Sequence, residues 1–175
     1  MENGEKGAGR QAVQVNVPAT TANIGPGFDC LGAALNLNNT FHLRSLKADS
    51  EDFELIIEST EGSHLRGGPE NLIYRSAQRV WREIGCAPRA LEARVHLAVP
   101  PARGLGSSAT AIVAGLLGAN ALEGEPLGKE KLLELAIDIE GHPDNVVPSL
   151  LGGLCLTARA ASHRWRGVRC EWHRQ

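Results

Sequence analysis

The chain has 175 residues, of which 42% are apolar and 22% are charged, so it can bury the core of one domain and is not a disordered protein. A net charge of -2 and an aromatic content of 4% argue against a nucleic-acid partner, because basic surfaces and stacking aromatic rings supply that binding. No apolar run reaches the roughly 20 residues that span a bilayer, and residues 1–11 lack the apolar core of a signal peptide. We therefore expect a cytoplasmic protein with no membrane partner.

The first third of the chain predicts strands and loops. Residues 1–11 are rich in charges and glycine and predict a flexible tail, and the alternating valines of residues 13–17 predict a strand. Residues 18–29 hold glycines, threonines and an asparagine and predict a long loop. Residues 31–46 predict a strand that bends at its Asn-Asn pair, and residues 53–57 predict a further strand.

The middle of the chain predicts a helix followed by a strand. Apolar residues at spacings of four, three and four place one buried face on a helix over residues 73–84. Asn71 is well placed to cap its start and Gly85 to end it. Residues 91–99 alternate apolar and polar side chains and predict a strand.

The last third predicts two helices, a strand and an unusual tail. Residues 107–122 predict a mostly buried helix, residues 129–139 a shorter amphipathic helix, and residues 154–157 a last strand. Residues 159–175 hold five arginines, two tryptophans and one acid, with no clear strand or helix period. This tail is either a surface extension or a sequence that replaces the natural continuation of the domain, and we favour the second interpretation.

The cysteines give no sign of a metal site or a redox pair. Cys30, Cys86, Cys155 and Cys170 form no C-x-x-C pair, so we expect each of them to be a reduced thiol.

A glycine-rich loop stands between the strand that ends near Val99 and the helix that begins at Ser107. Its sequence is Pro101-Ala102-Arg103-Gly104-Leu105-Gly106-Ser107-Ser108-Ala109. Glycines two residues apart permit turns that point several backbone N–H groups and a helix N-terminus at one place, which favours phosphate binding. The chain contains neither G-x-x-x-x-G-K-[ST] nor G-x-G-x-x-G, so it is not a common P-loop or dinucleotide-binding protein.

A second polar segment, Glu140-Gly141-His142-Pro143-Asp144-Asn145, offers groups that a transfer reaction could use. The loop and this segment together favour a nucleotide-dependent enzyme.

Three segments resemble one family. The loop, P-x-x-G-L-G-S-S-A, resembles the phosphate loop of the GHMP kinase superfamily. The segment Pro18-Ala19-Thr20-Thr21-Ala22-Asn23-Ile24-Gly25-Pro26-Gly27-Phe28-Asp29 is similar to the N-terminal signature of homoserine kinases. Residues 140–148, followed by Leu151-Gly152-Gly153, resemble a third homoserine kinase segment. The resemblance covers residues 13–157.

The resemblance implies a fold and an activity. The fold is the α+β GHMP kinase N-terminal domain, which is like domain 2 of ribosomal protein S5 and has a left-handed β-α-β unit. The activity is transfer of the ATP γ-phosphate to the hydroxyl of L-homoserine, which gives O-phospho-L-homoserine for threonine biosynthesis. ATP and Mg²⁺ are the implied cofactors, and a homodimer is compatible with the family.

The resemblance also assigns the nucleotide and metal sites. The residues it places around ATP are Pro101, Ala102, Arg103, Gly104, Leu105, Gly106, Ser107, Ser108, Ala109, Thr110, Ala111 and Asn71. Ser108 and Glu140 would hold Mg²⁺, which binds few protein oxygens besides phosphate. Helix capping is the alternative for Ser107, Ser108 and Asn71, and a solvated helix end is the alternative for Glu140.

The acceptor and transfer residues follow from the same likeness. Asn23, Asp29 and His142 would bind homoserine, with Asp29 pairing with its ammonium group. The alternatives are local turns for Asn23 and Asp29 and a surface histidine for His142. Asn145 would position the hydroxyl. The alternative for this step is Asp144 as a general base. The local interpretation of Asp144 is a cap of the short segment from Val146.

The expected organisation is a flexible tail at 1–11, an ATP-binding domain at 12–157 and a basic tail at 158–175, with the C-terminal GHMP domain missing. Two other functions stay open. One is a different small-molecule kinase of the superfamily, which would be favoured if Asn23, Asp29 and His142 did not converge. The other is an inactive fragment that binds nucleotide.

Overall fold

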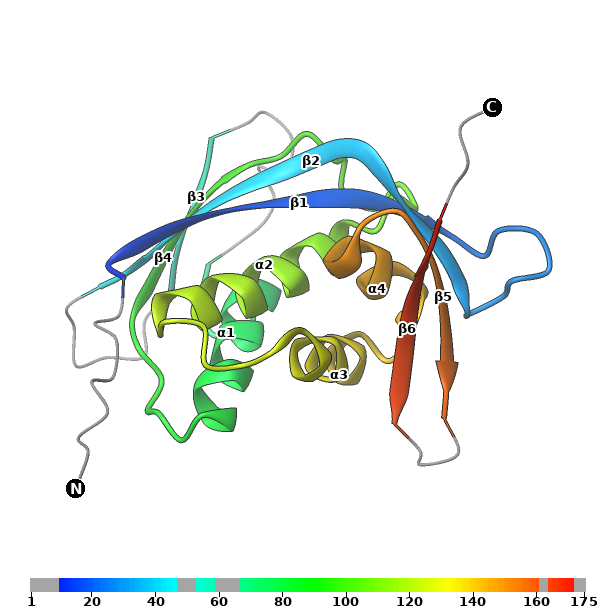
Figure 1. Cartoon of the computed structure of the whole chain (residues 1–175). Coiled ribbons are helices and arrows are strands. Elements are labelled where there is room, and N and C mark those ends of the chain that lie inside the picture. The colour runs from blue at the N-terminus through cyan, green and yellow to red at the C-terminus, as the bar shows by residue number, and fades with distance from the viewer. Residues whose placement is uncertain (1–9, 47–52, 59–66, 161–163, 172–175) are drawn as a thin grey trace, which may run out of the picture.

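The computed structural model describes residues 10–46, 53–58, 67–160 and 164–171. Within these ranges the chain forms six strands and four helices (Figure 1). The elements in chain order are β1 (Ala12–Ala22), β2 (Leu31–Ser45), β3 (Phe53–Ile57), α1 (Leu72–Glu83), β4 (Leu91–His96), α2 (Ser107–Leu122), α3 (Lys129–Glu140), α4 (Pro143–Leu151), β5 (Leu154–Arg159) and β6 (Trp165–Cys170). The mixture of strands and helices confirms the expected α+β class.

The long strand β2 organises the sheet. It pairs antiparallel with β1 along most of its length, with β4 over Thr40–Ser45, and with β5 over Leu31–Ala33. Strand β3 lies parallel to β4 and is joined to it through α1, which makes a β-α-β unit. The register of β1 and β2 shifts between Pro18 and Thr20, and a shift of this kind redirects the side chains that follow it.

The helices lie on one side of the sheet, with α2 directly under β1 and β2 in Figure 1. Helix α2 is buried on nearly all sides because it is packed between the sheet and α1. Two glycines permit this packing: a Cβ at Gly115 would overlap the carbonyl oxygen of Ile73 on α1, and a Cβ at Gly118 would overlap Leu43 on β2. The first residues of α2 are therefore held firmly at the end of the sheet.

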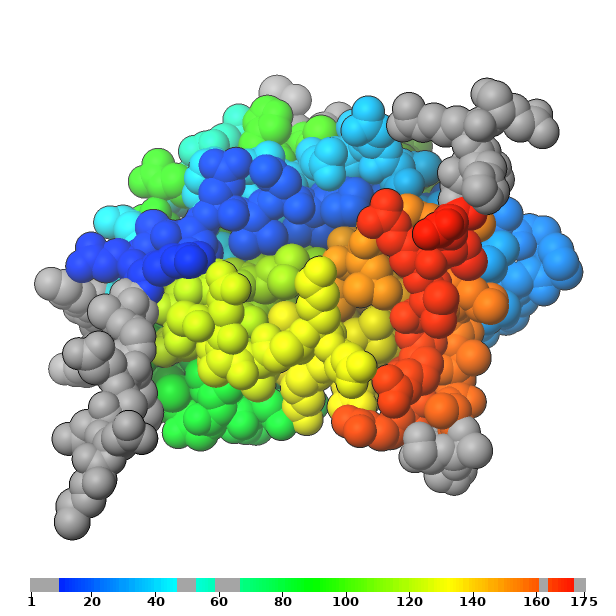
Figure 2. Space-filling model, viewed as in Figure 1, coloured from blue at the N-terminus to red at the C-terminus, as the bar shows by residue number. Residues whose placement is uncertain are grey.

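Strands β5 and β6 form an antiparallel hairpin that lies beside α3 (Figure 2). Arg164 and Arg166 pair with Glu134 and Glu130 of α3 at 2.9 and 3.2 Å. Gly167 lies so close to α4 and α3 that a Cβ there would crowd Val147 and Leu133. The basic segment from residue 158 thus contributes a strand to the sheet.

Most predicted elements are confirmed. They include the strands at 13–17, 31–46, 53–57 and 154–157, the cap and stop of α1, and the bounds of α2. The strand predicted at 91–99 ends at His96, because the buried side chain of Asn39 accepts hydrogen bonds from the N–H groups of Ala98 and Val99 at 2.9 and 2.8 Å. Most of the predicted flexible tail lies outside the described residues.

Three stretches differ from the prediction. The loop predicted at 18–29 is wrong over residues 18–22, which continue β1 after the register shift and pair with β2. Helix α4 is not predicted, although residues 143–151 are helical. Strand β6 is not predicted either, because its partly buried positions hold a tryptophan, a glycine and a cysteine among arginines, so no clear apolar alternation marks it. Within the described part of the chain the four cysteines are free, and none of the helices is long and apolar enough to cross a membrane.

Candidate active site

The loop of residues 101–106 turns sharply before α2. Ala102, Gly104 and Gly106 have φ values of 57°, 71° and 66°, in the left-handed region that favours glycine. A non-glycine residue there costs energy, so Ala102 is held in place by its surroundings. Gly106 is the N-cap of α2 and supplies no capping side chain. The first N–H groups of α2 therefore face this turn without a side-chain acceptor among the described residues, which suits an anion.

Ser107 does not cap the helix, so that interpretation is wrong. It is the first residue inside α2, and its carbonyl oxygen accepts a hydrogen bond from Thr110 Oγ1 at 2.8 Å. The cap position falls on Gly106 because the left-handed turn must come directly before the helix.

An apolar cavity of about 350 Å³ opens beside this loop. Ala102, Ser107, Ser108 and Ala111 line one side, and apolar residues of the sheet and α1, such as Phe41 and Leu97, line the rest. Concave, mostly apolar sites with a few polar groups are typical of sites for flat organic groups. The apolar cavity suits the flat base of a nucleotide, and the adjoining turn suits its phosphates.

Asn71 lies at the rim of the cavity and has the predicted capping role. Its side-chain oxygen accepts a hydrogen bond from Ile73 N at 2.9 Å at the start of α1. The same residue lines the cavity, so capping and a place near a bound ligand are compatible.

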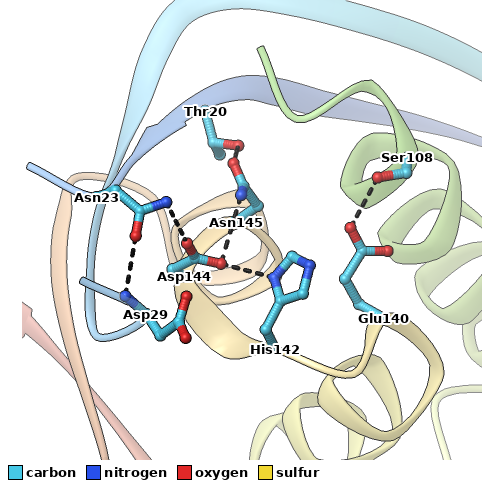
Figure 3. Close-up of polar contacts among 8 residues, drawn as sticks. All are labelled: Thr20, Asn23, Asp29, Ser108, Glu140, His142, Asp144 and Asn145. Atoms are coloured by element: carbon cyan, nitrogen blue, oxygen red, sulfur yellow. Dashed lines mark hydrogen bonds and ion pairs between the residues drawn. The ribbon is translucent and has the colours of Figure 1, made fainter. Parts of the chain in front are cut away.

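Ser108 and Glu140 meet across the loop (Figure 3). Ser108 Oγ, in the first turn of α2, donates a hydrogen bond of 2.7 Å to Glu140 Oε1, at the last residue of α3. A hydroxyl and a carboxylate are oxygen ligands that Mg²⁺ accepts. Among the described residues no group of three or more His, Cys, Asp or Glu side chains could hold a metal. This pair suits a cation that takes its other ligands from phosphate and water.

A second group of side chains, here called the acceptor cluster, consists of Thr20, Asn23, His142, Asp144 and Asn145 (Figure 3). Asp144, in the first turn of α4, is at its centre and only 2% exposed. Asp144 Oδ2 accepts from Asn23 Nδ2 at 3.1 Å, and Asp144 Oδ1 lies 2.7 Å from His142 Nδ1 and 3.4 Å from Asn145 Nδ2. The buried carboxylate is therefore satisfied by three neighbouring side chains.

These contacts correct one interpretation and extend another. Asp144 does not cap a segment from Val146, because α4 begins at Pro143 and its N-cap is His142. His142 is half-exposed, so the surface interpretation is correct, and its ring is also oriented by Asp144. In Figure 3 its other ring nitrogen points toward the side where Ser108 and Glu140 lie.

Asn23 and Asp29 belong to the loop between β1 and β2. Both have left-handed φ values, 58° and 54°, and Asn23 Oδ1 accepts a hydrogen bond of 3.0 Å from Asp29 N. The local-turn interpretation is thus correct, and Asn23 also reaches Asp144. The Asp29 carboxylate makes no hydrogen bond or ion pair with a described residue, so it is available to a ligand. Asn23 and His142 therefore meet at Asp144, and the backbone of Asp29 contacts Asn23.

Thr20 is the member that sequence reasoning missed. It is fully buried, and Thr20 Oγ1 donates a hydrogen bond of 2.8 Å to Asn145 Oδ1. It had been assigned to a loop, where a threonine is ordinary. Its place in the N-terminal signature was the one signal that could have singled it out.

The chain is similar to known proteins of one family. Residues 71–153 match the family model described as the GHMP kinases N terminal domain. The chain is 82% identical over 161 residues to a protein of Synechococcus sp. (strain RCC307) named homoserine kinase, covering 92% of this chain and 51% of that one. It is 77% identical over 162 residues to a protein of the same name from Prochlorococcus marinus (strain MIT 9303), covering 93% of this chain and 51% of that one.

A solved structure shows the same likeness. The crystal structure of homoserine kinase from Cytophaga hutchinsonii has a TM-score of 0.78 and 30% identity, covering 91% of this chain and 52% of that one. The chain spans about half the length of the curated relatives that it matches.

Proposed function

We propose that this chain, whose residues 71–153 match the GHMP kinases N terminal domain, provides the ATP and acceptor sites of a homoserine kinase. The reaction transfers the γ-phosphoryl group of ATP to the hydroxyl of L-homoserine, which gives O-phospho-L-homoserine in threonine biosynthesis. The hydroxyl oxygen bonds to the γ-phosphorus, the bond from that phosphorus to the bridging oxygen of ADP breaks, and the hydroxyl proton passes to solvent water. The proposal assigns residues 12–157 to the ATP-binding domain and places the protein in the cytoplasm.

The observation that carries the proposal is the order of three features in space. The apolar cavity adjoins the loop of residues 101–106, the loop leads into Ser108 and Glu140, and Gly106 contacts the acceptor cluster. The adenine ring would occupy the cavity near Asn71, and the phosphates would bind the backbone N–H groups of residues 101–111. The γ-phosphate would then lie toward the acceptor cluster.

Ser108 and Glu140 are the residues that would hold Mg²⁺. Their 2.7 Å contact brings two hard oxygen ligands together at the phosphate-binding turn, so these residues fit the ion. Bound there, Mg²⁺ would neutralise charge on the phosphate oxygens. Glu140 has no basic residue in the last turn of α3 to balance it, which supports a cation as its partner.

The acceptor cluster would hold homoserine. Asp29, with its unpaired carboxylate, would bind the ammonium group, and Asn23 and His142 would contact the rest of the amino acid. Asn145 is the better choice for positioning the hydroxyl, because it is only partly buried and one Nδ2 hydrogen remains available. Asp144 is less suited to be a general base, since both its oxygens are engaged and it is 2% exposed.

A second candidate is a domain that binds Mg²⁺–ATP without turning it over. The observation that favours it is that the chain spans about half the length of its curated relatives. A different kinase of the superfamily is less favoured, because Asn23, Asp29 and His142 belong to one connected set of hydrogen bonds.

The test is an ADP-release assay with Mg²⁺, ATP and L-homoserine, run beside other small alcohols and beside a Ser108→Ala variant. Turnover that requires homoserine and falls in the variant would support the kinase. Nucleotide binding by calorimetry without turnover would support the second candidate. If neither binding nor turnover appears in a chain that melts cooperatively by circular dichroism, both candidates fail.

A further inference from the structure

Thr20 connects parts of the molecule that are far apart in the sequence. Thr20 Oγ1 bonds to Asn145 Oδ1 at 2.8 Å, across 125 residues. Its backbone N–H donates a hydrogen bond of 3.1 Å to the carbonyl oxygen of Leu105, in the phosphate-binding turn. One residue of β1 therefore holds both the nucleotide loop and the acceptor cluster.

The chemistry of the neighbours determines how the Asn145 amide is turned. A carboxylate can only accept hydrogen bonds, so the side of Asn145 that faces Asp144 must be the Nδ2 donor. The amide oxygen then faces Thr20, whose hydroxyl must donate. Removing that hydroxyl leaves the oxygen without its partner, so that only the longer contact of 3.4 Å with Asp144 restrains rotation of the amide.

Gly106 closes the third side of this arrangement. A Cβ at Gly106 would overlap Thr20 Oγ1 and lie 3.2 Å from Asn145 Oδ1. The turn before α2 is thus packed directly on the Thr20–Asn145 hydrogen bond. A shift of the loop and a rotation of the amide would disturb each other.

The β1 register shift explains why Thr20 points inward. Val15 and Val17 are buried at alternate positions, but after the shift Ala19 and Thr20 are both fully buried. A regular strand would turn one of these two side chains away from the core. The irregularity therefore brings the hydroxyl to the site.

We propose that Thr20 is a positioning residue whose hydroxyl orients the Asn145 amide, while its backbone N–H, which Thr20→Val keeps, holds Leu105 of the nucleotide loop. The expected effect of Thr20 on turnover rests on the proposed function. The expected effect on the orientation of the Asn145 amide does not.

Thr20→Val is the decisive variant, because it keeps the shape of the side chain and removes the hydroxyl. Thr21→Val makes the same change at the next residue, whose side chain has no hydrogen bond to a described residue. Thr20→Ser restores the hydroxyl. If Thr20→Val does not melt cooperatively, Thr20→Ala compared with Thr20→Ser takes its place.

The first readout is the side-chain amide signal of Asn145 in the ¹⁵N-labelled full chain, assigned by its loss in Asn145→Asp. We expect Thr20→Val to move both amide hydrogens toward the shifts of a solvent-exposed amide, while Thr20→Ser and Thr21→Val leave them near the wild-type positions. Unchanged Asn145 signals in a folded Thr20→Val protein would overturn the proposal.

The second readout separates positioning from general loss of structure. We expect homoserine-dependent kcat to fall about tenfold or more in Thr20→Val, with the affinity for Mg²⁺–ATP nearly unchanged and with recovery in Thr20→Ser. Equal losses of kcat and ATP affinity would overturn the proposal. If the wild-type chain has no turnover, the proposed kinase function fails for this chain, and the amide signals alone decide the role of Thr20.

Discussion

The phosphate-binding turn and the acceptor cluster touch at Gly106, yet they are built in different ways. The turn is a continuous stretch of eleven residues, 101–111, shaped by left-handed glycines and by the start of α2. The acceptor cluster takes side chains from β1, the loop that follows it and α4, and joins them through the buried carboxylate of Asp144. The first region depends on backbone conformation and the second on long-range side-chain contacts.

This difference predicts how each region responds to mutation. A side chain in the exposed turn can be removed with little effect on folding, because its partners regain water. A side chain in the acceptor cluster supports both the ligand site and the packing of α4 on the sheet, so its loss should reduce stability and function together.

Asp144→Ala should have the largest effect. It removes the shared acceptor of Asn23, Asn145 and His142 and leaves a space where the buried carboxylate packs, and we expect a loss of about 3 kcal/mol in the free energy of unfolding. Urea unfolding of the purified chain measures it. Asp138→Ala is the control, because Asp138 is 61% exposed and pairs weakly with Arg79, and it should cost about 0–1 kcal/mol. Equal stability of the two variants would contradict the central role of Asp144.

Gly106→Ala tests the contact between the two regions. Its φ of 66° and the overlap of a Cβ with Thr20 should together cost about 2–3 kcal/mol and weaken ATP binding. Gly104→Ala is a matched control with a φ of 71° and no atom within 4 Å of the added Cβ, and it should cost about 1 kcal/mol. Thermal melts and calorimetry give both values. If Gly104→Ala is the more damaging change, the turn and the cluster are not packed as described.

Ser108→Ala should separate function from stability. We expect turnover to fall about 10- to 100-fold, as for the loss of a metal contact, with a change of less than about 0.5 kcal/mol in unfolding free energy. Glu140→Gln should act similarly, and the double variant should be little worse than either single change. Glu134→Gln, on the same helix but paired with Arg164, is the control. Additive losses in the double variant would argue against a shared cation.

Asn71→Ala should cost about 1 kcal/mol, because α1 loses the side chain that accepts from Ile73 N. Asn71→Asp keeps the cap and should recover that stability in the same thermal melts. A difference in ATP affinity between wild type and Asn71→Asp would then report on the cavity rather than on the helix. Failure of Asn71→Asp to recover stability would mean that the cap is not the source of the loss.

The smallest effect should come from Glu92 on β4, away from both regions. The hydrogen bond from Arg44 at 2.7 Å holds the pKa of Glu92 below its ordinary value, against the opposing effect of burial. Because the folded pKa is the lower one, the stabilisation is complete above the unfolded pKa of about 4.3 and is lost as the pH falls through the folded pKa. Urea midpoints from pH 7 to pH 3 should show wild type losing its advantage over Glu92→Gln at the acid end. If the stability advantage of wild type over Glu92→Gln grows as the pH falls, Arg44 does not lower the pKa of Glu92.

Sequence reasoning predicted the conformation of the loop before α2 well because its signals are local. Gly104 and Gly106 mark left-handed turns, the apolar run from Ala109 marks a buried helix, and Asn71 marks a cap, each within a few neighbouring residues. It predicted less well where a partner lies far along the chain. Residues 18–22 were assigned to a loop, although pairing with β2 makes them a strand, and β6 carries no apolar alternation of its own.

The residue pattern by itself determined the bounds of α2 and the glycine turn, and the resemblance of three segments to one family implied the α+β class and the candidate residues Asn23, Asp29, His142, Asp144 and Asn145. The tertiary structure alone decided how they meet. It made Asp144 the buried centre of the acceptor cluster instead of a cap, and it brought Thr20 to Asn145. The physical reason is that periodicity and capping act over one or two turns of chain. The hydrogen bonds from Thr20 to Asn145 and from Asn23 to Asp144, by contrast, join residues more than a hundred positions apart, and only the packed sheet and helices bring these together.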